Sequence, residues 1–361
     1  MSGLKHLPGL NGMRAIGVLM IMIFHFSQHM SAFGFAPREV FPYAHQMVVM
    51  FFVLSGFLIT GLLLREQETN GHVNTRHFYM RRLLRVWPAY FIALTLLITV
   101  YFFAGKPLDT VTLLLYTFFL GNIPIVLGTG IGSIAQLWSL GVEEQFYLVW
   151  PWLFRRRKWV LPAILFSIVL YYVLRGYFAW AGHHKAYRLL VLSSYQCMAW
   201  GGILAWGWHY GKRWITWAYH PVIQVLAWGW CLLNTCWLVK LPAGIMAEWN
   251  AVIFGIIMLN VATNPRSLIR LENRFLAWIG NISYGIYLYH MFAFSIVLGV
   301  LQHQLAPTAG AYGLVVLLAG LLAVLGAWAS YRLVEQYFLR LKSRFAYPGK
   351  PASMIREGGY A

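Results

Sequence analysis

An arginine and a histidine stand eleven residues apart in the first apolar stretch of the chain, and both residue types do chemistry. Arg14 can bind an anionic group, and the imidazole of His25 is the usual general base near neutral pH. In a helix, eleven residues rise ~16 Å and leave only ~20° of rotation, so both side chains are expected on one face. An anion held at Arg14 could then reach His25 with a long, narrow arm. The alternative interpretation of His25 is a helix–helix contact.

Two adjacent glutamates, Glu143 and Glu144, lie well inside an apolar segment, whereas Glu248 falls near the start of a span and Glu335 at the end of the last helix. An ionisable side chain within a membrane span costs at least ~2.5 kcal/mol on insertion scales, so each is a functional candidate. Adjacent helical residues point about 100° apart, so we expect one glutamate to line a site while the other pairs with an arginine or with backbone. The alternative is a structural pair that anchors an irregular segment. His290, which closes Ser283–His290 in a later span, is a second histidine candidate.

A basic cluster follows the second apolar run. On a helix, Arg81, Arg82 and Arg85 would form a ledge at the membrane edge. Lipid headgroups and the phosphates of a ligand are both possible partners for such a ledge. Ser55 is interpreted as a small packing residue. The cysteines (Cys197, Cys231, Cys236) have no CxxC spacing, so neither a disulfide framework nor a metal site is predicted.

The elements that must position these residues are membrane helices. Of the 361 residues, 60% are hydrophobic and only 11% are charged, whereas soluble domains carry about 25% charged residues. This composition excludes a soluble globular protein and intrinsic disorder. The formal net charge of +18 does not indicate nucleic-acid binding, because the basic residues sit mostly between apolar runs, as at membrane edges.

The sequence predicts an all-α integral membrane protein with about ten transmembrane helices. A bilayer needs roughly 20 apolar residues per helix, and eleven candidate runs occur. They are 13–32, 46–64, 87–104, 110–127, 137–154, 159–180, 189–209, 214–238, 244–263, 276–301 and 309–334. Eleven full crossings would place Arg155–Lys158 outside, against the positive-inside rule. Counting 110–154 as one net crossing, with a broken or re-entrant segment, places this cluster and both termini in the cytoplasm. We expect one transmembrane domain over 1–345 and a flexible cytoplasmic tail over 346–361.

Five motifs, in this order along the chain, resemble those of the acyltransferase family 3 membrane proteins. They are Leu10-Asn-Gly-Met-Arg14 with His25, Phe51-Phe-Val-Leu-Ser-Gly-Phe57, Arg81-Arg-Leu-Leu-Arg85-Val-Trp-Pro88, Trp138-Ser-Leu-Gly-Val-Glu-Glu-Gln-Phe-Tyr147 and Ser283-Tyr-Gly-Ile-Tyr-Leu-Tyr-His290. The match covers about residues 5 to 340. This family includes the bacterial O-acetyltransferases that modify O-antigen and exopolysaccharide.

The resemblance implies transfer of an acyl group, usually acetyl from acetyl-CoA as co-substrate, to a hydroxyl of a sugar, glycan or lipid-linked saccharide. It implies a multi-pass protein of the bacterial cytoplasmic (inner) membrane, with Arg14 and His25 as the functional core. Asn11 stands where family members often carry Asp, so a charge role there is absent. No extracytoplasmic SGNH-type domain follows the last span, so we expect the chain to complete transfer alone or to pass the acyl group to a separate extracytoplasmic transferase.

Our hypothesis for the mechanism assigns a role to each candidate residue. The CoA phosphates bind Arg14, Arg81, Arg82 and Arg85, and His25 acts as base or acyl carrier. Glu143 or Glu144 orients the imidazole, as a carboxylate does for a catalytic histidine. Trp138, Tyr287 and His290 bind the acceptor. The rival hypotheses are a transporter or flippase without chemistry, and a member of the unrelated membrane-bound O-acyltransferases.

Overall fold

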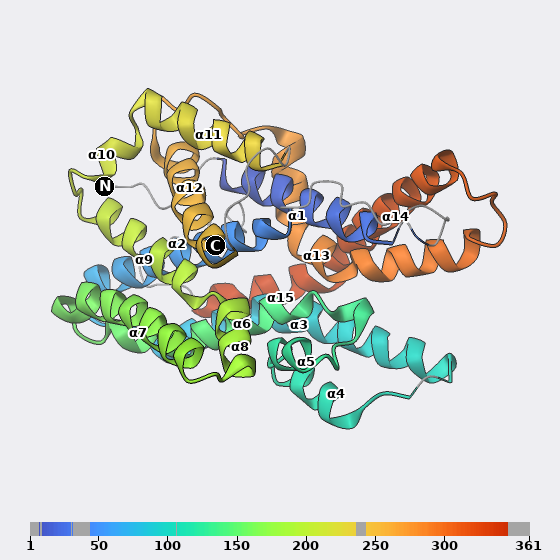
Figure 1. The fold of residues 1–361 in the computed structure, drawn as a ribbon. Helices are drawn as coiled ribbons and strands as arrows, with labels where there is room; N and C mark the ends of the chain where they lie inside the picture. The colour runs from blue at the N-terminus through green and yellow to red at the C-terminus, as the bar shows by residue number, and fades with distance from the viewer. Residues whose placement is uncertain are drawn as a thin grey trace.

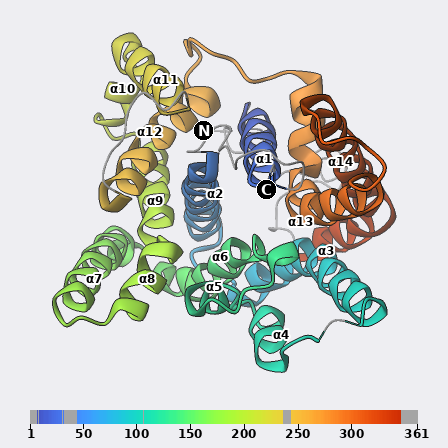
Figure 2. The ribbon, with the colours of Figure 1, turned by 45° about the vertical axis from the view of Figure 1, so that its right-hand side comes forward.

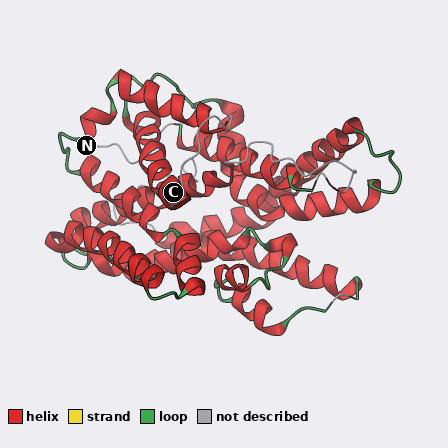
Figure 3. Cartoon of the chain, viewed as in Figure 1, coloured by secondary structure: helices red, strands yellow, loops and turns green. Residues whose placement is uncertain are grey.

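The computed structural model describes residues 9–29, 44–105, 107–235 and 243–345, together with Leu7 and Ser31, and these parts of the chain contain helices and no strand (Figure 3). The long helices are α1 (Leu10–Ser27), α2 (Met47–Asn70), α3 (Thr75–Phe103), α7 (Val160–Trp180), α9 (Tyr195–His209), α11 (Pro221–Thr235), α12 (Ala243–Thr263), α13 (Arg274–Leu301) and α14 (Ala309–Ser330). Shorter helices are α4 (Thr110–Thr117), α5 (Asn122–Leu127), α6 (Leu137–Val149), α8 (His184–Ser193), α10 (Ile215–Ala218) and α15 (Gln336–Leu341). The all-α prediction is confirmed. The predicted tail, 346–361, lies outside the described residues.

Eight helical segments within the described residues are long and apolar enough to cross a membrane, which confirms a multi-span membrane protein. The apolar helix Pro221–Asn234 is shorter than these eight. The predicted break near 110–154 is present as three separate helices of 8, 6 and 13 residues. None of the three alone matches the ~20 residues of a full crossing. The expected count of about ten is therefore reached only if α11 and the α4–α6 region each provide one crossing.

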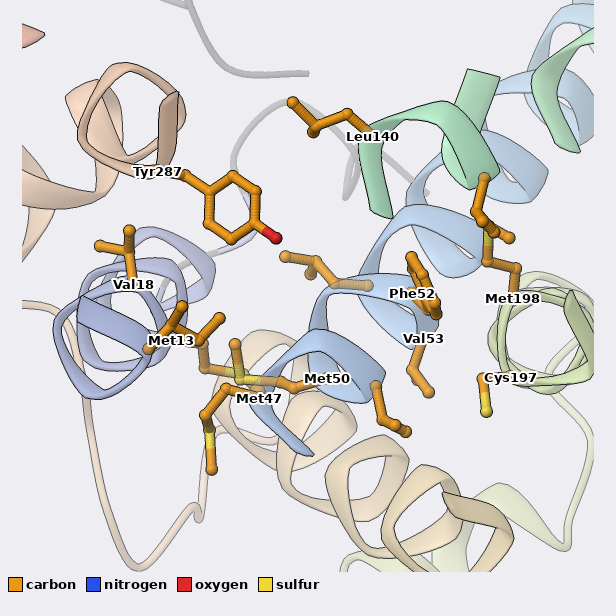
Figure 4. Close-up of a cluster of buried hydrophobic side chains, with 14 of the residues drawn as sticks. Met13, Val18, Met47, Met50, Phe52, Val53, Leu140, Cys197, Met198 and Tyr287 are labelled. Atoms are coloured by element: carbon orange, nitrogen blue, oxygen red, sulfur yellow. The ribbon is translucent and has the colours of Figure 1, made fainter. Parts of the chain in front are cut away.

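The two helices α1 and α2 run through the interior, with the other helices arranged around them (Figures 1 and 2). Figure 4 shows α2 between α1 on one side and α9 on the other, with Phe52 and Val53 directed towards α9 and Met47 and Met50 lying nearer α1. These side chains belong to one buried apolar core. A helix that is apolar on most of its circumference suits this interior position.

Glycines bring α2 and α9 close together. A Cβ atom at Gly56 would collide with the backbone of Met198, and one at Gly201 with the backbone of Val53. Membrane helices gain little from the hydrophobic effect between them, so close van der Waals contact through small residues stabilises their packing. Gly280 serves the α1–α13 contact in the same way, because its Cβ would collide with the backbone of Asn11. This contact sets α1 beside α13, and these two helices carry Arg14, His25, Tyr287 and His290.

The start of α3 is fixed by polar contacts. Asn74 caps the helix by accepting a hydrogen bond from the His77 backbone N–H at 3.0 Å. The carboxylate of Glu66, near the end of α2, accepts from the Asn74 backbone N–H at 2.9 Å and from Arg81 at 3.1 Å. Side-chain caps of this kind satisfy backbone donors that a helix leaves unpaired. The α2–α3 connection is thereby held, and Arg82 and Arg85 follow on the next turn of α3.

Candidate active site

A cavity with an empty volume of about 1040 Å³ lies between α1, α2, α3, α6 and α13. Its apolar wall comes mostly from α2. Its polar wall combines side chains from the other four helices: Arg14, Arg82, Arg85, Ser139, Glu143, Glu144, Tyr147, Asn281, Ser283, Tyr284 and Tyr287, with Ser55 of α2. A largely apolar pocket with a few convergent polar groups is the usual form of a ligand site.

Three arginines give one part of the cavity a basic character. Arg14 of α1 donates to the Asn11 side chain at 3.1 Å, and Asn11 donates to Asn281 of α13 at 3.0 Å. The Arg82 guanidinium lies over the Tyr147 ring, 5.4 Å from its centroid, and Arg85 follows one turn later. Guanidinium groups bind phosphates with paired hydrogen bonds, so this wall suits a phosphorylated ligand.

Both glutamates line this same cavity, which corrects the expectation that only one of them would. The cavity extends around α6 far enough to meet two side chains about 100° apart. Glu143 accepts a hydrogen bond from the Tyr147 hydroxyl at 3.1 Å. The Oε1 atom of Glu144 is buried and has no hydrogen-bond partner within the described residues. With both carboxylates ionised, the formal charge of the lining is +1, which still favours an anion.

Arg81 does not line the cavity, although the sequence grouped it with Arg82 and Arg85. Its side chain is buried and pairs with Glu66 at 3.1 Å, and it also donates to the Phe345 carbonyl at 2.9 Å. Residues 81 and 82 of a helix point about 100° apart, so the two arginines meet different surroundings. Arg81 therefore joins α2, α3 and the end of the described chain.

His25 contacts the other histidine candidate, His290 of α13. The His25 Nδ1 atom lies 2.8 Å from the His290 Nε2 atom, and the two rings are nearly parallel, with centroids 5.1 Å apart and planes 5° apart. The prediction that a glutamate orients the His25 imidazole is not what the structure shows. Within the described residues, the ring hydrogen bond of His25 goes to His290, and Glu143 bonds to Tyr147 instead.

Neither histidine is part of the cavity lining, and Tyr287 is the residue that connects the two sites. Its ring lines the cavity and lies 5.9 Å from the His290 ring. Its hydroxyl is 2.7 Å from the Ser139 hydroxyl and donates to the Gln136 carbonyl at 2.9 Å. Figure 4 shows the phenol directed from α13 into the interior. Trp138 is absent from the cavity lining and packs edge-on against Phe52.

Several lining residues were not singled out from the sequence. Ser55, interpreted as a packing residue, faces the cavity, as do Tyr147 and Asn281. Tyr147 stands four residues after Glu143, which puts the two on one helical face, so this signal was available. Asn281 carried no comparable signal, because its link to Asn11 joins residues 270 positions apart.

Within the described parts of the chain, no three histidine, cysteine or acidic side chains are placed to hold a metal ion.

The comparisons with known proteins concern the same helices. The family model described as "Acyltransferase domain" matches residues 7–332. Peptidoglycan O-acetyltransferase OatA of Listeria monocytogenes serovar 1/2a is 27% identical over 323 residues, which cover 79% of this chain and 49% of that protein. No solved structure matches the chain.

Two further relatives match a shorter stretch of the chain. "Putative O-acetyltransferase SACOL0978" of Staphylococcus aureus (strain COL) is 32% identical over 158 residues, which are 41% of this chain and 24% of that protein. "Putative peptidoglycan O-acetyltransferase YrhL" of Bacillus subtilis (strain 168) is 32% identical over 158 residues, 41% of this chain and 23% of that protein. This chain spans at most about half the length of these three relatives.

The family match covers every helix that lines the cavity, and eight segments of the described chain are fit to cross a membrane. The chain therefore belongs to the acyltransferase family defined by this domain, and it is a multi-span membrane protein.

Proposed function

We propose that this chain transfers an acetyl group from acetyl-CoA to a hydroxyl group of a glycan or lipid-linked saccharide, in the cytoplasmic membrane of a bacterium. The observation that supports this most directly is the cavity, in which three arginines from two helices face one space. CoA carries its phosphates at one end and the acyl thioester at the end of a long, narrow arm. A lining that combines arginines with an apolar wall suits that shape.

The donor phosphates bind Arg14, Arg82 and Arg85 in this proposal, and Arg81 is left out because it pairs with Glu66. Along α13, Asn281 beside Arg14 and Tyr287 at the inner part of the cavity are six residues apart, a rise of ~9 Å. His290 lies three residues further, another ~4.5 Å along the helix. The arm of the donor therefore runs along α13 and brings the thioester towards the two histidines.

His25 is the proposed general base. It takes the proton from the acceptor hydroxyl while the hydroxyl oxygen attacks the thioester carbonyl carbon, the C–S bond breaks, and an ester forms. The proton then leaves His25 for the CoA sulfur, so the imidazole returns neutral. In the alternative route His25 carries the acetyl group briefly and passes it on. Glu143 and Glu144 balance the charge of the arginines around the CoA phosphates, since neither bonds to His25.

The acceptor is proposed to be extracytoplasmic, and the three relatives carry names of O-acetyltransferases, two of them for peptidoglycan. Acetyl-CoA is cytoplasmic, so the arginine end of the cavity faces the cytoplasm in this proposal. Trp138 and Tyr287 are retained as proposed contacts on the acceptor side. The acetyl group is passed either to the glycan directly or to a separate extracytoplasmic transferase.

The test uses the full chain in membrane vesicles with radiolabelled acetyl-CoA. Loss of labelled glycan on His25→Ala is expected, with a reduction of about 100-fold or more, the typical contribution of a general base. His303→Ala, which changes an exposed histidine beyond the end of α13, should keep normal transfer. Normal transfer by His25→Ala would overturn the proposed mechanism.

A second measurement separates an enzyme from a transporter of another solute. Acetyl-CoA should raise the thermal stability of the purified protein, because a ligand that binds the folded state stabilises it. The thermal shift should persist in His25→Ala, since His25 is not part of the cavity lining. Absence of any shift with acetyl-CoA would favour a transporter without acyl-transfer chemistry.

A further inference from the structure

The two histidines form a pair whose hydrogen positions are determined by what surrounds them. His290 is only 1% exposed, and its Nδ1 atom lies 2.8 Å from the Tyr287 carbonyl oxygen and 3.1 Å from that of Ile286. Carbonyl oxygens only accept hydrogen bonds. The His290 Nδ1 atom must therefore carry a hydrogen and donate it to the backbone of its own helix.

This assignment determines the other nitrogen of His290. A neutral imidazole has one N–H and one lone pair, so the Nε2 atom of His290 is an acceptor. Its partner at 2.8 Å is the Nδ1 atom of His25, which must then be the donor. The hydrogen of a neutral His25 ring is thereby assigned to Nδ1, and the lone pair is left on Nε2. The second hydrogen bond that a histidine makes generally sets its tautomer in this way.

We propose that His290 is a positioning residue for the acyl transfer, which holds His25 in the Nδ1–H tautomer so that its Nε2 atom is the base. This inference rests on the proposed function, in which His25 takes the acceptor proton. His290 would do what the buried carboxylate does in a serine protease, where a hydrogen bond to Nδ1–H orients the catalytic imidazole. It replaces the predicted orientation by Glu143 or Glu144, and it replaces the predicted contact of His290 with the acceptor.

The pair also accommodates the charge that the reaction produces. When His25 Nε2 takes the proton from the acceptor hydroxyl, the cation strengthens the Nδ1–H hydrogen bond to His290. If that hydrogen moves to His290 Nε2, the cation is held by the Ile286 and Tyr287 carbonyls at Nδ1. No carboxylate next to His25 is needed, and the proton returns by the same path when the CoA sulfur takes it.

The surroundings of the pair explain why the ring positions are fixed. The His29 Nδ1–H donates to the His25 carbonyl at 2.9 Å, one turn along α1. The Phe26 ring lies 6.2 Å from that of His290, and the Phe24 ring lies 5.5 Å from that of His25 and 5.6 Å from that of His45. Among the described residues, the titratable groups around His25 are three histidines, His29, His45 and His290. Of these three, His290 is the one that hydrogen-bonds to the His25 ring.

The experiment compares two substitutions of His290 in the full chain. His290→Leu removes the acceptor, whereas His290→Gln places an amide oxygen near the former Nε2 position. In His290→Leu we expect kcat to fall about 100-fold, while KM for acetyl-CoA stays within about twofold of the wild-type value. In His290→Gln we expect kcat to be at least about tenfold higher than in His290→Leu. His303→Gln, on an exposed histidine, is the matched control and should leave both parameters unchanged.

A second readout reports the tautomer itself. Nitrogen NMR of histidine-labelled protein, with the His25 signals identified from the His25→Ala variant, should show hydrogen on Nδ1 in the wild type and in His290→Gln. In His290→Leu this preference should be lost. A thermal shift with acetyl-CoA equal to that of the wild type shows that a variant is folded. If either variant lacks this shift, His290→Asn is used in its place.

The outcomes of the two proposals can be told apart. If His25→Ala keeps full activity, the proposed base is wrong, whatever His290 does. If His25→Ala is inactive while His290→Leu keeps wild-type kcat and an unchanged His25 tautomer, the positioning role is wrong and the proposed function stands. Equal kcat losses in His290→Leu and His290→Gln with an unchanged tautomer would also overturn it.

Discussion

Four arginines, one on α1 and three on α3, differ in what they contact, and this difference separates ligand binding from stability. Arg14, Arg82 and Arg85 line the cavity, whereas Arg81 is buried in an ion pair with Glu66. An arginine on a cavity wall can change affinity without changing the fold. An arginine that forms a buried ion pair neutralises a neighbouring carboxylate, so its loss leaves that carboxylate buried without its partner.

Arg82→Gln should weaken acetyl-CoA binding. A hydrogen bond to a charged group contributes about 1.5–3 kcal/mol, so KM for acetyl-CoA should rise about tenfold or more while thermal stability changes little. Arg82→Lys should give an intermediate KM, because an ammonium does not reproduce the paired geometry of a guanidinium. Steady-state kinetics in vesicles measure both. Arg76→Gln, exposed and on the same helix, is the control, and an equal KM change there would contradict a specific role for Arg82.

Arg81→Gln should act on stability instead. Removing one partner of a buried pair costs about 3–5 kcal/mol, because the carboxylate of Glu66 then stays buried and uncompensated. The double variant Glu66→Gln, Arg81→Gln should regain part of this loss. Thermal unfolding in detergent measures the change, and KM for acetyl-CoA in the folded fraction should stay near the wild-type value. A raised KM without lost stability would instead place Arg81 in the ligand site.

How far these residues could be predicted from sequence depended on how local their partners are. The arginine ledge and the Arg14–His25 spacing follow from positions within one helix, so their candidates were found. The ion pair of Arg81 depends on Glu66, fifteen residues earlier in another helix. The contact of His25 depends on His290, 265 residues away, and no helical periodicity connects the two. Helical periodicity therefore identified the candidate side chains, but it could not predict which distant residues they contact.

At the scale of elements, the region 110–154 was predictable from charge and not from hydropathy. Its two apolar runs resemble two crossings, and only the basic residues after Phe154 indicated a break. The structure has α4, α5 and α6, with left-handed backbone at Phe119 and Gly128 between them. Hydrogen bonds from Gln145 to the Phe119 carbonyl and to Asn122 hold these pieces together. Such tertiary bonds make irregular backbone tolerable at membrane depth.

A π-helical turn, Tyr331–Glu335, was likewise not predictable from the sequence. It lies between α14 and α15, and Glu335 is buried in it. Its carboxylate accepts from the Ser330 hydroxyl at 3.3 Å, and the Ser330 and Tyr289 hydroxyls are 2.9 Å apart. A wider turn changes which residues share a face, so the usual period of 3.6 residues gives the wrong neighbours there.

The packing of α2 against α9 gives a prediction at this scale. Gly56→Ala should destabilise the protein by several kcal/mol or prevent its folding, because the new Cβ would collide with the Met198 backbone, which cannot move as a side chain can. Gly176→Ala in α7 meets no atom within 4 Å and should raise stability by about 0.5–1 kcal/mol, the helix preference of alanine over glycine. Thermal unfolding in detergent compares the two. Equal effects would contradict a close approach of α2 and α9.

On the scale of the whole molecule, the residues proposed for catalysis lie towards the interior, and an outer helix exposes apolar side chains. Arg14 and His25 lie on α1, within the ring of other helices (Figure 2). The outer helix α7 exposes large apolar side chains such as Phe166, Val169 and Val173. In a soluble protein such a surface would be a liability, whereas the hydrocarbon core of a bilayer accepts it. The polar cavity is lined by five helices, α1, α2, α3, α6 and α13.

Contacts between distant segments place several basic clusters at one end of the bundle. Arg81, at the start of α3, donates to the Phe345 carbonyl, and Gln67, near the end of α2, donates to the Phe154 carbonyl at 2.6 Å. Arg155–Lys158 directly follows Phe154. The starts of α3 and α7 and the end of the described chain therefore share one side of the membrane. The positive-inside rule predicts that this side is the cytoplasm, which is the proposed orientation.

This arrangement predicts the labelling of two single cysteines in a chain whose native cysteines are replaced by alanine. Arg156→Cys and His183→Cys both lie at exposed positions, one before the start of α7 and one after its end. A membrane-impermeant maleimide should label His183→Cys in intact spheroplasts and Arg156→Cys only after the membrane is disrupted, because one full crossing separates them. Labelling of both after disruption is the control for reactivity. The reverse pattern would put the cavity arginines outside, away from cytoplasmic acetyl-CoA, and would contradict the proposed direction of acetyl transfer.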